Sequence, residues 1–139
     1  MEIADVKRRV VDTIEAAKRR AADRRVRTDE ATKAYEAFLS RIAVPMFRQI
    51  ANVLKSESYP FNVFTPGASV RLVSDRASDD YIEITLDTTD DEPAVSGQTR
   101  RSRGRRVIES ERALGDPAKM TEDDVLAFVM KELGPFVER

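Results

Sequence analysis

The first part of the chain carries apolar residues at helical spacing. In residues 2–24 an apolar side chain recurs every three or four positions, which places them in one narrow stripe on an otherwise charged helix. The stripe consists of Ile3, Val6, Val10, Ile14, Ala17 and Ala21. The segment has no Gly or Pro and is rich in good helix formers. It predicts an amphipathic helix with most of its surface in water.

A second segment, residues 29–57, predicts a helix with a wider apolar stripe that suits a protein core. Pro45 lies in the middle of this segment. A proline inside a helix removes one backbone hydrogen bond and clashes with the preceding turn, so we expect a kink or a break near residues 42–44. No strong breaker separates the two segments. Residues 2–57 therefore form either one helix or two.

From residue 61 onward the apolar period changes from helical to two. Residues 81–88 give the clearest strand, because Ile82, Ile84 and Leu86 alternate with polar residues. Weaker strands are expected near residues 61–65, 70–72, 94–100 and 105–112. The short connections favour an antiparallel meander, since parallel strands need long crossovers.

The last element is a helix over residues 122–133. Thr121 is its candidate N-cap, and three acidic residues fill its first turn. Gly134 and Pro135 are expected to end it.

Together these patterns predict an α+β fold. It has a long N-terminal amphipathic helical segment, of one helix or of two that kink near Pro45, then an antiparallel meander of four to five strands and a C-terminal helix. The second and last helices are expected to cover the apolar face of the sheet, which leaves the first helix no place in that core. We therefore divide the chain into a helical arm, residues 1–27, and an α+β domain, residues 28–139.

Composition removes most familiar kinds of enzyme site. The 139 residues include no Cys and no His, so thiolate chemistry, disulfides and the commonest general base and zinc ligand are missing. The five Gly are isolated and form no phosphate-binding loop. We therefore expect no cofactor, no metal site and no enzymatic activity.

Carboxylates gather in two loops and leave one weaker alternative open. The two groups are Asp75, Asp79 and Asp80, and Asp87, Asp90, Asp91 and Glu92. Oxygen ligands of this kind can hold calcium or magnesium, but neither run has the spacing of a calcium loop. Aspartates also favour turns, which is the simpler interpretation. A metal-dependent enzyme that uses these acidic loops stays the weaker alternative.

The net charge of −1 conceals charged blocks. Residues 1–27 carry nine basic and five acidic groups, whereas residues 61–99 carry two and eight. Five arginines fall within seven residues at a predicted hairpin tip, namely Arg100, Arg101, Arg103, Arg105 and Arg106. Arginines bind phosphate well, and a basic ribbon can enter a groove of nucleic acid. They could equally pair with acids of neighbouring strands, such as Glu83 or Glu109.

These observations lead to a functional hypothesis. We expect a non-enzymatic interaction or adaptor protein that acts as a homo-oligomer, with a dimer favoured, through its N-terminal helices. The subunit contact would consist of Ile3, Val6, Val10, Ile14 and Ala17. The arginine hairpin would then meet an acidic protein partner. The stripe could instead pack on its own domain, or the arm could be disordered.

The alternative hypothesis is a nucleic-acid-binding protein that uses the Arg100–Arg106 hairpin and the basic N-terminal helix. In either case the opening residues lack the apolar core of a signal peptide, and no window approaches the ~18 apolar residues needed to cross a bilayer. We therefore expect a cytoplasmic protein with no membrane partner.

Overall fold

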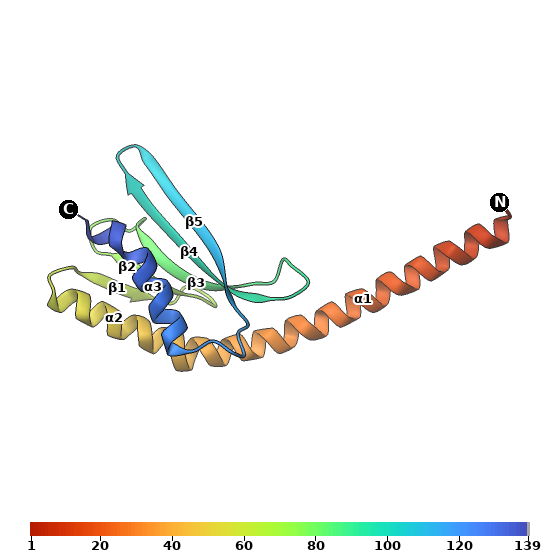
Figure 1. Ribbon diagram of the computed structural model, residues 1–139, viewed down its shortest axis with the longest axis horizontal. Helices are drawn as coiled ribbons and strands as arrows, with labels where there is room; N and C mark the ends of the chain where they lie inside the picture. Colours follow the sequence, from red (N-terminus) through yellow and green to blue (C-terminus); the bar gives the residue numbers. More distant parts are fainter. Residues whose placement is uncertain (139) are drawn as a thin grey trace.

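The computed structural model describes residues 1–138 and confirms the α+β class (Figure 1). A long helix comes first, then a five-stranded sheet, then one more helix. The helical elements are α1 (Ile3–Phe38), the π-helical turn η1 (Leu39–Ala43), α2 (Val44–Ser56) and α3 (Glu122–Val137). The strands are β1 (Phe61–Phe64), β2 (Val70–Ser74), β3 (Tyr81–Asp87), β4 (Ala94–Arg103) and β5 (Arg106–Gly115).

The elements α1, η1 and α2 form one continuous helix, which would be about 80 Å long at 1.5 Å per residue. Of the kink or break expected near residues 42–44, the helix has the kink, at a π-helical turn in which the Val44 N–H donates to the Leu39 carbonyl five residues back. The wider turn accommodates the proline, which has no N–H to donate to Arg41. Figure 1 shows the helix axis changing direction here.

The π turn also brings two parts of the core onto one side of the helix. In a regular α-helix the twelve residues from Tyr35 to Phe47 would leave the two side chains about 120° apart. The π turn contains one residue more than a regular turn, which offsets about 100° of this rotation. The side chains of Tyr35 and Phe47 therefore point in nearly the same direction. Both side chains are fully buried, at 1% and 0% exposure.

The sheet is an antiparallel meander in the order β1-β2-β3-β4-β5. Strands β4 and β5 are longer than predicted and pair from Val95↔Gly115 out to Arg103↔Arg106. Their outer half extends beyond the rest of the sheet as a two-stranded ribbon (Figure 1, upper left).

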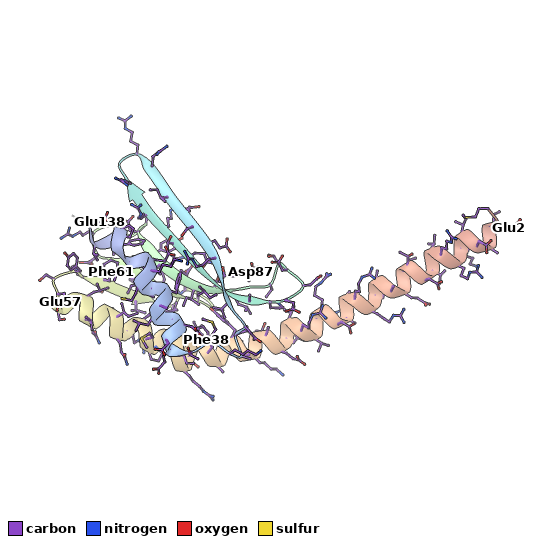
Figure 2. The ribbon with its side chains drawn as sticks, in the orientation of Figure 1. Glu2, Phe38, Glu57, Phe61, Asp87 and Glu138 are labelled. Atoms are coloured by element: carbon purple, nitrogen blue, oxygen red, sulfur yellow. The ribbon has the colours of Figure 1, made fainter. Side chains whose placement is uncertain are left out.

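Helices cover only one face of the sheet. The end of α1, η1 and α2 pack on β1 to β3, and α3 lies across β3 and β4. In Figure 2 Phe38 sits where the long helix meets this core, whereas Glu2 lies at the far end of the arm. Gly97 allows α3 its close approach, because a Cβ at this position would overlap the ring of Phe128.

The C-terminal helix begins as predicted and ends later. Thr121 and Asp124 form a reciprocal capping box at its start. The prediction that Gly134 and Pro135 end it was wrong, because α3 continues to Val137. A proline in the last turn costs only one hydrogen bond, and Phe136 and Val137 pack against the core in return.

Candidate interaction surfaces

The arm leaves the body of the protein at the loop between β3 and β4. Arg24 Nε lies 3.1 Å from Asp91 Oδ1, and Arg27 Nε donates to the Asp91 carbonyl at 3.2 Å. Beyond these contacts the helix stands clear of the sheet (Figure 1, right). The arm is therefore anchored at one end and open along its remaining length.

All five residues of the predicted subunit contact lie on this open part. Ile3 is 86% exposed, Val10 is 51% exposed and Ile14 is 48% exposed. Val6 and Ala17 are also exposed. A contiguous apolar stripe in water marks an interaction surface or an aggregation risk rather than an ordinary surface.

The stripe faces the same side of the helix as the body does. The apolar stripe continues, by steps of three and four residues, into the row of side chains that leads to the core under the sheet. This row runs through Ala17, Ala21, Arg24, Thr28, Ala31, Tyr35 and Phe38. Ala17 and Tyr35 are 18 residues apart, which is five complete turns. The arm thus extends the core-facing side of the helix into solvent.

The arm also contains an internal repeat that our sequence analysis missed. The sequence KRRVVD at Lys7–Asp12 returns as KRRAAD at Lys18–Asp23, eleven residues later. Eleven residues make three helical turns, so equivalent residues of the two copies lie on the same line along the helix. Comparing the sequence with itself at fixed offsets would have found this repeat.

The repeat puts basic side chains on both borders of the stripe. Lys7 and Lys18 lie on one border, and Arg9 and Arg20 lie on the other. The acids of the repeat, Asp12 and Asp23 among them, point away from the stripe. Of the basic side chains on the open arm, only Arg8 has an ion pair, 2.7 Å from Asp5, among those that the structure gives for residues 1–138.

The arginine hairpin separates its charges between two faces. Residues along a strand alternate sides, and the pairs Arg101↔Ile108 and Arg103↔Arg106 lie on the same face as the apolar core. The pair Arg100↔Glu109 lies on the opposite face. A two-residue turn joins the strands, with Gly104 at φ +63°.

Pairing within the protein accounts for one of these five arginines. Arg100 Nε lies 3.7 Å from Glu109 Oε1. No hydrogen bond or ion pair involves the other four side chains in the part of the chain that the structure describes, namely Arg101, Arg103, Arg105 and Arg106.

Glu109 thus pairs with Arg100 as expected, but Glu83 and two further acids of the neighbouring strands have other partners. Glu83 binds Arg71 at 2.7 Å, and Glu111 accepts from Ser96 at 3.1 Å. Asp87 accepts from the side chain and backbone of Thr89, and these bonds lower the pKa of Asp87. The core-side face of the hairpin tip is consequently a cluster of unneutralised arginines.

The acidic loops do not assemble a metal site within residues 1–138, where no three acidic side chains converge. Asp91 binds the arm, and Asp80 accepts from the backbone N–H of Ser102 at 2.8 Å. The buried Tyr35 hydroxyl donates to the Ala68 carbonyl at 2.7 Å. Burial, assisted by the nearby Glu83 carboxylate, raises the pKa of Tyr35, and we assign this hydroxyl a structural role.

Comparison of the chain with protein-family models, curated proteins and solved structures finds no match. Across residues 1–138, no helix has both the length and the apolar character needed to span a membrane.

Proposed function

We propose that this chain is a non-enzymatic cytosolic interaction protein that assembles into a homo-oligomer, with a dimer favoured, through its N-terminal arm. The observation that carries the proposal is the exposed apolar stripe that continues the core-facing row of the long helix. Inside the body this row is covered by the sheet, and on the arm nothing in residues 1–138 covers it. Twofold dimers are the commonest way in which proteins cover such a surface.

The energetics favour a partner for the arm. Most helical stability in proteins comes from packing of an apolar face, and on the open arm this face lies in water. Burial of apolar surface contributes roughly 25 cal/mol per Å². A second helix against the stripe would therefore stabilise both the contact and the arm itself.

Light scattering tests the proposal through the mass in solution. We expect the native protein at tens of micromolar to have twice the chain mass of 15.7 kDa. Val10→Asp combined with Ile14→Asp places two carboxylates in the contact and should give the mass of one chain. Val26→Asp is the matched control, because Val26 is 55% exposed but lies on the far side of the helix. A native protein with the mass of one chain would contradict the proposal.

A second candidate function is nucleic-acid binding through the arginine hairpin. The separation of its charges supports this candidate, because Arg101, Arg103 and Arg106 share one face and none of them has an ion pair among the described residues 1–138. A two-stranded ribbon fits the major groove, and arginine binds phosphate through paired donors.

Titration of labelled DNA and RNA at about 50 and 200 mM salt tests this second candidate, since contacts to several phosphates lose orders of magnitude in affinity over that range. Arg101→Ala with Arg106→Ala should weaken binding at least about tenfold, by analogy with other multi-phosphate contacts. Arg100→Ala, which removes the paired arginine on the other face, is the control. Absence of binding at the lower salt concentration would rule out this function.

A further inference from the structure

We infer that two copies of the chain pair their arms antiparallel, with the first eleven-residue repeat of each arm against the second repeat of the other. This inference rests on the proposed function, since it specifies how the arm associates. It is carried by three features of the arm, namely the direction in which its stripe faces, the sizes of the residues in the stripe and the period of the repeat.

The direction of the stripe excludes a parallel pair. The sheet and the β3–β4 loop lie on one side of the long helix (Figure 1), and the stripe faces that side because helical spacing places it in line with Arg24, which contacts the loop, and with Tyr35, which is buried under the sheet. A partner helix that ran parallel along the stripe would continue past Arg24 into Asp91 and the body. A flat surface, such as a bilayer, would meet the same obstruction. An antiparallel helix places its own body at the opposite end, where nothing obstructs it.

The residue sizes of the two repeats complement one another in this arrangement. Positions eleven residues apart along the stripe pair Ile3 with Ile14, Val6 with Ala17 and Val10 with Ala21, so the larger side chains lie toward the N-terminus of the arm and the two alanines toward the body. Antiparallel pairing sets large against small at both ends of the contact. Parallel pairing would set Ala17 and Ala21 against themselves at one end and Ile3 and Val6 against themselves at the other, which leaves unfilled space between straight helices at the alanine end.

The register follows from these pairs. Ile3 faces Ala21 of the partner subunit, Val6 faces Ala17 of the partner subunit, and Val10 faces Ile14 of the partner subunit. The contact extends from Ile3 to Ala21, a rise of about 27 Å along the helix. In this register the helix of the partner begins beside Ala21, just short of the loop that holds Arg24. A repeat of eleven residues is close to the natural period of the α-helix, so the arms can run side by side with little supercoiling.

The charges on the borders of the stripe predict how salt affects the pair. In an antiparallel pair like borders face each other, so Lys7 lies opposite Lys18 of the partner subunit. Residues 1–27 carry nine basic and five acidic groups, and only Glu2, opposite Arg20, offers an acid along this contact. Added salt screens the net repulsion and should therefore strengthen the dimer. A complex with an acidic helix, an anionic bilayer or nucleic acid would be weakened by salt instead.

The absence of cysteine makes disulfide crosslinking a direct test. The sequence has no Cys, so a single introduced thiol reports on one position only. Ile3→Cys, Ala21→Cys and an equimolar mixture of the two are oxidised mildly at a concentration where the native protein is dimeric. We expect crosslinked dimer only in the mixture. Val26→Cys mixed with Ile3→Cys is the control for random collision, because Val26 lies on the far side of the helix.

The outcomes separate this inference from the proposal on which it rests. Crosslinking of Ile3→Cys with itself would mean a parallel pair, and a dimer by light scattering with no crosslink in the mixture would mean a different surface. Either result overturns the antiparallel arrangement and leaves self-association intact. A single-chain mass for the native protein overturns both.

A salt titration adds a second readout that needs no substitution. We expect the dissociation constant of the dimer, measured by sedimentation, to fall about two- to fivefold between about 50 and 300 mM salt as the Debye length shortens. A constant that rises with salt would overturn the arrangement, because it would require opposite charges to face each other across the contact. Binding of a monomeric native protein to anionic vesicles would also overturn it.

Discussion

One continuous helix divides into two halves that meet opposite surroundings. The inner half, residues 28–56, packs its apolar row under the sheet, and Phe47 there is fully buried. The outer half, residues 3–27, carries the same row into solvent, and Val10 there is 51% exposed. Neither the backbone nor the spacing of the row changes at the boundary. What changes is the width of the apolar row, which is narrow on the arm and wide in the inner half, and whether the sheet covers it.

The largest expected effect on stability is the difference between truncating a side chain in the inner half and truncating one in the outer half. Phe47→Ala should lower the free energy of unfolding by about 3–5 kcal/mol, because it leaves a cavity in a close-packed core. Val10→Ala should change it by less than about 0.5 kcal/mol when measured on dilute monomer. Urea denaturation followed by circular dichroism checks both values. Equal losses would show that the arm belongs to the same cooperative unit as the core.

A smaller effect is expected at Tyr35, where the inner half buries a titratable group. Because the pKa of Tyr35 is raised in the folded protein, this group's stabilising effect is complete below the unfolded value of 10.0 and diminishes as the pH rises beyond it. Tyr35→Phe should cost about 1–1.5 kcal/mol at pH 7, since it removes the bond to Ala68. It should also flatten the loss of stability above pH 10. Chemical denaturation at pH 7 and at pH 10.5 compares the two proteins, and an unchanged alkaline slope would contradict the assignment.

Two threonine substitutions compare how much a side chain contributes to stability at the start of α3 and in the middle of the arm. Thr121→Ala should lower the free energy of unfolding by about 1 kcal/mol, because it removes the capping box of α3. Thr13→Ala should have almost no effect, since the Thr13 hydroxyl only donates to the Arg9 carbonyl within the helix, and alanine favours helix. Thermal unfolding measures both. A loss at Thr13 as large as at Thr121 would mean that the arm contributes to global stability.

The smallest effect is expected at the boundary between the halves. Asp91→Asn weakens an exposed contact with Arg24, and such surface pairs contribute roughly 0–1 kcal/mol. Global stability should therefore hardly change. Amide hydrogen exchange in residues 20–27 should quicken a few-fold, whereas exchange in α2 stays the same. Faster exchange throughout α2 would show that the loop supports the whole helix rather than its outer half.

The sequence was informative where a local pattern decides the structure. The alternation of Ile82, Ile84 and Leu86 identified β3, and Thr121 identified the start of α3. The lack of a place in the core for the first helix correctly predicted the exposure of its stripe. These features depend on neighbours within a few residues, or on comparing the number of amphipathic helices with the one apolar sheet face that they can cover.

Other features depend on tertiary packing that no local pattern contains. Pro45 indicated a disturbance of the helix, but the choice of a π turn follows from seating both Tyr35 and Phe47 in one core. The continuation of α3 past Pro135 depends on the burial of Phe136 against the sheet layer. Which arginines of the hairpin find an acid depends on strand register, because a slip of one residue would exchange the two faces.

The π turn has a consequence for the direction in which this protein can associate. The arm is continuous with α2, so the angular phase set between Phe38 and Phe47 is transmitted to Ile3, about 54 Å further along the helix. Removing one residue between those two phenylalanines, with α2 held in the core, would rotate the arm by about 100° about its own axis. The stripe would then point sideways, and the body would no longer stand in the path of a parallel partner. The geometry of assembly is thus determined outside the arm, by the number of residues that separate two buried rings.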